Sequence, residues 1–165
     1  MSTLSQEITT LLVRELEGFK RELDLFPDDE TLWKTVPGVT NSAGNLALHV
    51  AGNLQQFVGR ELGGIPYQRN RDDEFGRRSG TRATVIEEVG RALAAVASVV
   101  PRLTGEQLEK PFDAHPGVVI STRRFLLHLC THTAFHVGQV GYLRRIVTAD
   151  PRSTNTVSAG RLGPA

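Results

Sequence analysis

Several features that define common classes of protein are missing from this sequence. Cys130 is the single cysteine among the 165 residues, so an internal disulfide cannot form and a cysteine-based zinc cluster is excluded. No stretch approaches the roughly 18 consecutive apolar residues that a membrane-spanning helix requires. The segment from Met1 to Thr10 alternates polar and apolar types and includes Glu7, so the apolar core of a signal peptide is absent. These absences favour a soluble protein of the cytoplasm.

An excess of charge of either sign is also lacking, since 19 basic residues face 18 acidic ones and the formal net charge is +1. Such a balance creates no field that would concentrate the protein on nucleic acid or on an anionic membrane. We therefore expect neither of them as a partner. The arginine pairs Arg123-Arg124 and Arg144-Arg145 are interpreted as solvated ends of one helix.

What the sequence does contain is a helical pattern of apolar residues. In four segments, apolar side chains recur every three or four positions, which is typical of amphipathic helices with one face in a core. Thr84 and Glu87 have the spacing of a capping box, and Ser121 is a suitable N-cap for the last helix. The predicted helices cover about residues 4–27, 45–62, 81–101 and 121–148.

This pattern sets the expected architecture. A chain of this length fits one domain, and four amphipathic helices joined by connections of uneven length form an all-α bundle. We predict a single four-helix-bundle domain with a long crossover connection over residues 1–150. Residues 151–165 are rich in serine, threonine, glycine and proline, and we expect them to form a flexible tail.

The expected connections carry most of the turn-forming and acidic residues. Residues 28–44 lack a helical period and are predicted to be a loop with one large anchor, Trp33. Residues 63–80 form a connection that is long for a helix bundle and rich in charge. The segment from His115 to Ile120 predicts a small hairpin or flap. Two acidic clusters are interpreted as solvated charge rather than as metal ligands: Asp28-Asp29-Glu30 and Asp72-Asp73-Glu74.

The histidines are the most informative residues. Because an α-helix turns about 100° per residue, His132 and His136 fall in the middle of the apolar stripe of the last predicted helix. Burying two imidazoles there without partners would cost roughly 1–3 kcal/mol each. Residues four apart on a helix stand about 6 Å apart on one face, so both rings can reach one metal ion. We therefore predict that this pair chelates a metal.

A third ligand is expected from another helix, because a zinc-type site needs more than two protein ligands. His49 is the candidate, since it shares the core-facing side of the second predicted helix with Asn53. His128 lies about 12 Å of helical rise from His136 and at the edge of the stripe, so it is excluded from a shared ion with both others. Asn53, Gln139 and His128 remain candidates for contacts with substrate or with the metal ligands. No catalytic residue is assigned.

These residues resemble a known family. The run from His132 to Gln139 is similar to the HxxxHxGQ motif of the DinB-like superfamily of bacterial four-helix-bundle metalloproteins, also called YfiT-like. Weaker matches lie in order along the chain, at Leu32-Trp33-Lys34, Pro37-Gly38, Asn41 to Leu46 and Leu48-His49, and the resemblance spans about residues 4–148.

The resemblance implies several properties. In that family the equivalents of His49, His132 and His136 form a metal triad with open coordination positions. A long crossover joins the helices, which accounts for residues 63–80, and many members form homodimers. Known activities in the family include metal-dependent transfer of low-molecular-weight thiols such as bacillithiol and a mycothiol-dependent maleylpyruvate isomerase.

The expected site indicates a type of chemistry. Three neutral imidazoles leave a divalent ion with its full charge and at least one open position, as in catalytic sites. Such an ion lowers the pKa of bound water toward about 7 and makes a bound thiol ionise more readily. Nitrogen ligation favours zinc or nickel as the divalent ion, with iron or manganese as further candidates.

We therefore predict a metal-dependent enzyme that acts on a small-molecule substrate, as a low-molecular-weight thiol S-transferase or as a hydrolase. Two alternatives stay open from the sequence. One is a bundle that binds a metal or a small ligand without turnover. The other is a purely structural bundle, whose histidines bond to one another or to buried water.

Overall fold

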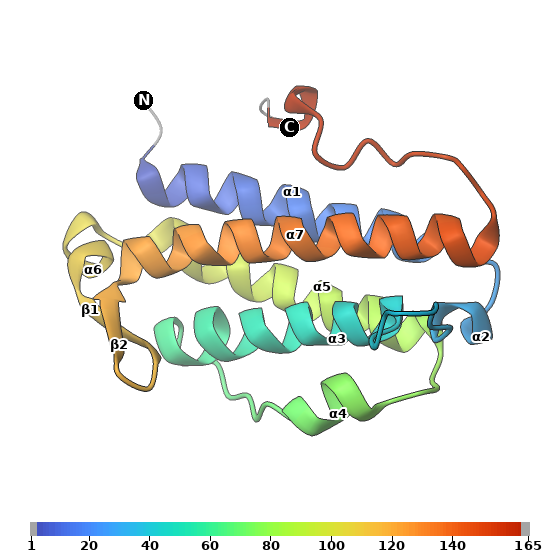
Figure 1. Ribbon diagram of the computed structural model, residues 1–165. Coiled ribbons are helices and arrows are strands. Elements are labelled where there is room, and N and C mark those ends of the chain that lie inside the picture. Colours follow the sequence, from blue (N-terminus) through green and yellow to red (C-terminus); the bar gives the residue numbers. More distant parts are fainter. Residues whose placement is uncertain (1–2, 163–165) are drawn as a thin grey trace.

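Four long helices run side by side in the computed structural model, which describes residues 3–162 (Figure 1). Helix α1 packs against α5 and α7, and α3 packs against the same two helices, so the four enclose one apolar core. This arrangement confirms the predicted all-α four-helix bundle. Met1, Ser2 and residues 163–165 of the expected tail lie outside the described residues. The long helices are α1 (Leu4–Asp24), α3 (Ala43–Leu54), α5 (Arg82–Val99) and α7 (Thr122–Thr148).

Shorter elements occupy the connections. Helices α3 and α5 run in the same direction, so the chain between them crosses back along the bundle, and α4 lies in this crossover (Figure 1). Two antiparallel strands, β1 (Pro111–His115) and β2 (Val118–Ser121), form the predicted hairpin before α7. The remaining elements are α2 (Asp29–Leu32), the π-helix η1 (Gln55–Leu62) that continues α3, α4 (Arg71–Gly76), η2 (Val100–Arg102), α6 (Gly105–Glu109) and η3 (Ala159–Leu162).

Side-chain caps fix where the long helices begin. The Ser42 hydroxyl accepts from the Asn45 backbone N–H at 3.2 Å, and the Asn45 side chain accepts from the Ser42 N–H at 3.1 Å. Ser121 caps α7, as predicted. The predicted capping box at Thr84 is wrong, because Thr81 is the N-cap of α5 and its hydroxyl accepts from the Thr84 N–H at 3.2 Å. No helix among residues 3–162 has the combination of length and apolarity that crossing a membrane requires.

Trp33 is the predicted anchor of the loop after α1, and it is buried. Its indole N–H donates to the carbonyl of Gly80 at 2.8 Å, at the end of the crossover. Its ring lies against Gly44 at the start of α3, where an added Cβ would come within 2.9 Å of two ring carbons. One side chain thus joins the first loop, the start of α3 and the end of the crossover.

Arg144 corrects the interpretation of the arginine pairs as solvated. Its side chain is fully buried between α1 and the segment that follows α7. The guanidinium donates to Glu22 Oε2 at 2.6 Å and to the carbonyls of Asp150 and Arg152. A charged group is stable at this depth because an opposite charge and backbone acceptors replace its water.

The segment after Pro151 is packed in part, which differs from the flexible tail expected from its composition. Thr154 donates its hydroxyl proton to Glu22 Oε1 at 2.6 Å, and Thr156 is buried. The methyl group of Thr156 occupies the space beside Gly18 of α1, where any Cβ would overlap it. The chain therefore returns along α1 after the end of α7, as Figure 1 also shows.

Candidate metal centre

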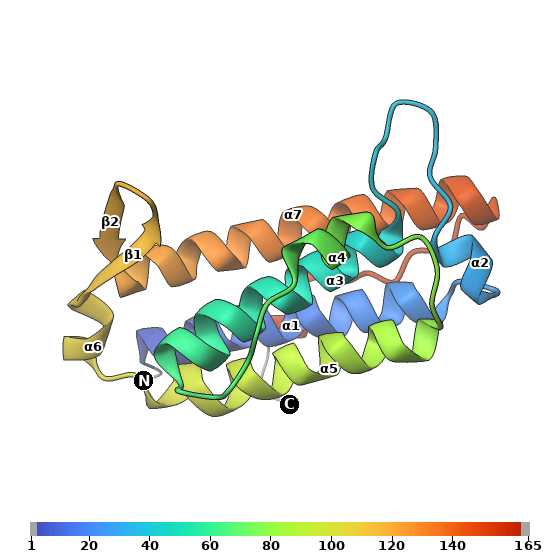
Figure 2. The same cartoon turned by 90° about the horizontal axis from the view of Figure 1, so that it is seen from below.

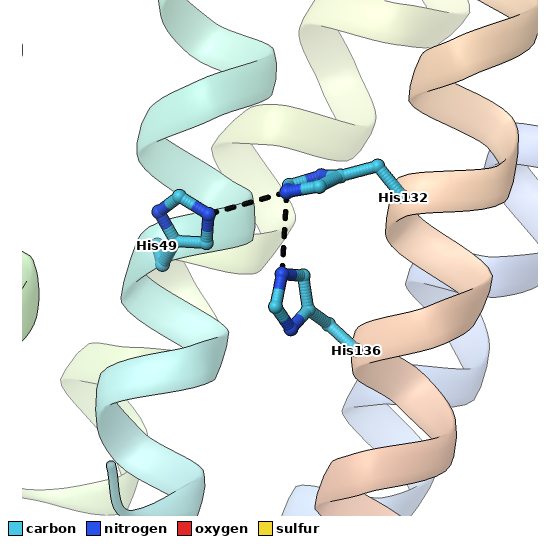
Figure 3. A group of neighbouring side chains, drawn as sticks. All are labelled: His49, His132 and His136. Atoms are coloured by element: carbon cyan, nitrogen blue, oxygen red, sulfur yellow. Dashed lines mark hydrogen bonds between the residues drawn. The ribbon is translucent and has the colours of Figure 1, made fainter. Parts of the chain in front are cut away.

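The three predicted histidines meet between α3 and α7 (Figure 3). His132 Nε2 lies 3.2 Å from His49 Nε2 and 3.2 Å from His136 Nε2. One potential ligand atom from each residue lies within 4.8 Å of the other two. The structure therefore confirms that the three side chains converge, as the helical spacing of residues 132 and 136 and the position of residue 49 indicated.

The spacing of the nitrogens fits a shared cation. Ligand bonds of about 2.0–2.1 Å in tetrahedral geometry place two nitrogens roughly 3.3 Å apart. The two distances of 3.2 Å agree with this value, and the potential ligand atoms of His49 and His136 lie within 4.8 Å of each other. The donor set is three imidazoles, which suits zinc and the later first-row metals better than calcium or magnesium.

Two of the three rings have a hydrogen-bond partner on the side away from the centre. His49 Nδ1 lies 3.1 Å from Glu74 Oε2, and His136 Nδ1 lies 2.7 Å from Gln139 Oε1. Both oxygens are acceptors, so a proton on each Nδ1 would leave a lone pair on each Nε2 facing the centre. A neutral His132 has at most one proton on Nε2, so it cannot satisfy both lone pairs at once. A cation at the centre would satisfy all three nitrogens.

Two members of the triad, His132 and His136, are kept neutral by their surroundings. Burial, together with smaller effects of the neighbouring His136 and His49, lowers the pKa of His132 to about 3. Burial also lowers the pKa of His136, against a smaller opposing effect of its hydrogen bond to Gln139 Oε1. Neutral imidazoles at neutral pH are the form that binds a metal. The buried Nδ1 of His132 has no hydrogen-bond partner among the described residues.

Glu74 is the site residue that sequence reasoning missed. The interpretation of its acidic cluster as solvated is wrong for this residue, since its side chain is buried against His49 and forms two hydrogen bonds with Arg69. Burial raises the pKa of the Glu74 carboxyl, but the hydrogen bonds from Arg69 and His49 lower it by more, so the net shift is downward. Asn70 caps α4, and its spacing to Asp73 was a signal for this short helix.

The other predicted site residues fall in different places. Gln139 contacts the triad through His136, as described. Asn53 lies one turn after His49, and its buried Oδ1 has no hydrogen-bond partner among residues 3–162. His128 is exposed, with its ring centroid 5.9 Å from that of His132. Cys130 is buried beside the carbonyl of Ile8, and burial raises the pKa of its thiol to about 11.

A cavity of about 450 Å³ adjoins the triad at His136. It lies between α7 and the loop that precedes α3, the loop that projects from the bundle in Figure 2. None of its lining side chains carries a formal charge, and most are apolar. The lining residues are Val36, Gly38, Val39, Thr40, Asn41, Leu46, His136, Gln139, Tyr142, Leu143 and Ile146. A small uncharged group therefore has room beside the triad.

Comparisons with known proteins agree with this architecture. No curated protein sequence matches the chain. A crystal structure of a conserved protein from Enterococcus faecalis is similar to it, with a TM-score of 0.73 and 17% sequence identity, covering 91% of this chain and 99% of that one. At such an identity the likeness shows the fold alone. The sequence model of the DinB superfamily matches residues 11–140, which include all three histidines. This chain belongs to the DinB superfamily.

Proposed function

We propose that the protein holds a divalent metal ion on His49, His132 and His136 and uses it in an enzymatic reaction on a small molecule. The observation that carries this proposal is the convergence of three imidazole nitrogens, with an oxygen acceptor behind two of the rings. A proton on the Nδ1 that faces each acceptor leaves the Nε2 lone pairs directed to one centre. A structural bundle would gain nothing from directing lone pairs toward each other.

The chain's own residues define what such a site does. When bound, the ion would lower the pKa of a water or thiol that binds it and so supply a nucleophile near neutral pH. Glu74 and Gln139 hold the ligand protons away from the centre. Gln139 lines the cavity, and its amide nitrogen has no hydrogen-bond partner among the described residues, so it is available to donate to a substrate oxygen. The apolar lining residues bind an uncharged part of the substrate and exclude water.

Two reactions fit a site that activates a nucleophile. The family resemblance supports the transfer of a low-molecular-weight thiol, and hydrolysis by a metal-activated water is the alternative. Zinc or nickel is the proposed metal because all three ligands are nitrogen, with iron or manganese as competitors. The balanced charge of the chain supports a small-molecule substrate rather than nucleic acid.

Metal content is the first test. Protein purified without a histidine tag is analysed by elemental analysis, and we expect about one equivalent of a transition metal per chain. His132→Ala should remove it while the far-ultraviolet circular dichroism spectrum is unchanged. His128→Ala is the matched control, because this histidine lies on the same helix but is exposed and outside the triad. Equal metal content in all three proteins would reject the site.

Turnover is the second test. The metal-loaded protein is screened with several cellular thiols and electrophilic acceptors, and with simple esters and amides for hydrolysis. An enzyme should give a reaction that disappears in His132→Ala and persists in His128→Ala. Stoichiometric metal with no reaction in any assay would favour the alternative, a bundle that binds its ion or ligand without turnover.

Assembly as a homodimer is a separate proposal. Phe135, Tyr142 and Ile146 are all more than half exposed, although they are large and apolar. Their spacing of seven and four places them along one side of α7, where a second copy could present the same stripe in a two-fold interface. Light scattering coupled to gel filtration should give twice the mass of one chain, and Phe135→Asp should reduce it. A monomer at all concentrations would contradict the proposal.

A further inference from the structure

The crossover between α3 and α5 is attached to the metal centre from outside the bundle. Its helix α4 lies along α3, on the side visible in Figure 2. The fully buried Asn45 of α3 donates from its amide to the carbonyls of Glu74 and Arg77, both at 2.9 Å. Because an α3 side chain holds the crossover backbone at residue 74 itself, the position of the Glu74 side chain relative to His49 is fixed.

Gly52 provides the space that the carboxylate occupies. It lies one turn after His49 on α3, and a Cβ at this position would overlap Glu74 Oε1 and would reach 3.3 Å from the Tyr67 hydroxyl. A glycine inside a helix costs roughly 0.5–1 kcal/mol relative to alanine. The close approach of Glu74 gives a reason for glycine here.

Arg69 binds both oxygens of that carboxylate. Its Nε donates to Glu74 Oε1 at 2.6 Å, and its Nη2 donates to Glu74 Oε2 at 2.8 Å. Such a two-point ion pair holds the carboxylate in one orientation, with Oε2 left to face His49 Nδ1 at 3.1 Å. An ionised carboxylate accepts hydrogen bonds and has none to donate.

An alternative proton placement can be compared directly. Arg69 Nη2 also lies 3.3 Å from His49 Nδ1, so an unprotonated Nδ1 could accept from it. That arrangement would set the Nδ1 lone pair against a carboxylate oxygen at 3.1 Å with no proton between them. A proton on Nδ1 instead gives both His49 Nδ1 and Glu74 Oε2 a hydrogen-bond partner.

We propose that Glu74, oriented by Arg69, is a positioning residue that keeps the proton of His49 on Nδ1 and the lone pair of Nε2 directed to the metal centre. The crossover is thereby part of the site, although it supplies no ligand. The consequence for metal affinity rests on the proposed function, whereas the position of the proton can be measured without any metal.

The first experiment locates the proton in the metal-free full-length chain. Nitrogen-15 NMR of the imidazoles distinguishes the two neutral tautomers of His49 by the chemical shifts of Nδ1 and Nε2. The wild-type protein should show His49 protonated on Nδ1. A proton on Nε2 in the wild-type protein would overturn the proposal, and this result does not depend on any variant folding.

The second experiment changes the acceptor. In Glu74→Gln, Arg69 should attract the single amide oxygen, so the amide N–H₂ should face His49 and move its proton to Nε2. Asp73→Asn is the matched control, because it makes the same change one residue earlier in α4, where the side chain pairs with Arg77 instead. We expect the tautomer to change in Glu74→Gln and to stay as in wild type in Asp73→Asn. An unchanged tautomer in both would overturn the proposal.

Metal titration completes the test. Removing a partner of a ligating histidine typically lowers metal affinity by about 10- to 100-fold. Competition with a chromophoric chelator for zinc should show this loss for Glu74→Gln and wild-type affinity for Asp73→Asn. Equal affinities for wild type and Glu74→Gln would overturn the role in metal binding. A wild-type protein with the expected tautomer but no zinc affinity would refute the proposed function and leave the positioning of His49 intact.

Discussion

Replacing Arg144 by alanine should destabilise the protein more than any other single change of a charged residue on α7. The substitution leaves the Glu22 carboxylate buried without its cation, and it removes the donors to the carbonyls of Asp150 and Arg152. Breaking a buried ion pair by removing one partner costs about 3–5 kcal/mol. A typical domain has a free energy of unfolding of about 5–15 kcal/mol, so the variant should still fold but be much less stable than the wild type.

Urea unfolding followed by circular dichroism measures this loss. With a denaturant dependence of about 2 kcal/mol per molar urea, a loss of 3–5 kcal/mol lowers the midpoint by about 1.5–2.5 M. Arg145→Ala is the matched control, because its side chain is half-buried and lies over the ring of Tyr142. That change should cost about 1 kcal/mol or less, as for most positions without a buried partner.

The double variant Glu22→Leu, Arg144→Met distinguishes the loss of the ion pair itself from the burial of an unpaired Glu22 carboxylate. Replacing a buried ion pair by apolar side chains of similar volume is often neutral, whereas removing one partner is not. The double variant should therefore recover most of the stability that Arg144→Ala loses. If Arg144→Ala and Arg145→Ala shift the urea midpoint equally, the assignment of Arg144 as a buried, paired cation is refuted.

The metal centre and its surroundings should respond to zinc, to pH and to a substitution at Gly52. Zinc at 100 times its dissociation constant should raise the free energy of unfolding by about 2.7 kcal/mol, which a thermal melt with and without chelator detects as a shift of about 5–11 °C. In metal-free protein, the pKa of His132 of about 3 lies below the ordinary 6.5, so only the unfolded state gains a proton between these values. The free energy of unfolding should therefore fall as the pH is lowered from 6.5 toward 3. In His132→Gln, which has no imidazole at this position, the urea midpoint should fall less steeply with pH than in the wild type. Gly52→Ala should displace Glu74 and speed hydrogen exchange of residues 71–76, and unchanged exchange there would contradict the close packing.

The sequence predicted the parts of the site that depend on local periodicity. His132 and His136 share a face because the helix repeats every 3.6 residues, and this relation holds whatever surrounds the helix. His49 was predicted as the third ligand because such a site needs more than two protein ligands and because His49 lies among apolar residues. These arguments require only that each helix directs its apolar face inward, which the structure confirms.

The parts that the sequence did not predict depend on contacts between distant segments. Glu74 and Arg144 were both interpreted as solvated because charged residues are usually exposed. Their burial depends on partners that lie 25 and 122 positions away in the sequence, at His49 and Glu22. Composition and spacing carry no signal for such pairings. The burial of Thr156 also depends on a distant residue, because its methyl group fills the space that Gly18 leaves by having no side chain.

The position of Trp33 gives the molecule a built-in optical probe. It is the single tryptophan of the chain, so the intrinsic fluorescence excited at long wavelength comes from one place. That place is the junction where the indole N–H is bonded to the carbonyl of Gly80. Detachment of the crossover would break this bond and expose the ring to water, which shifts indole emission to the red. Emission wavelength can therefore follow the attachment of the crossover in real time, in unlabelled protein.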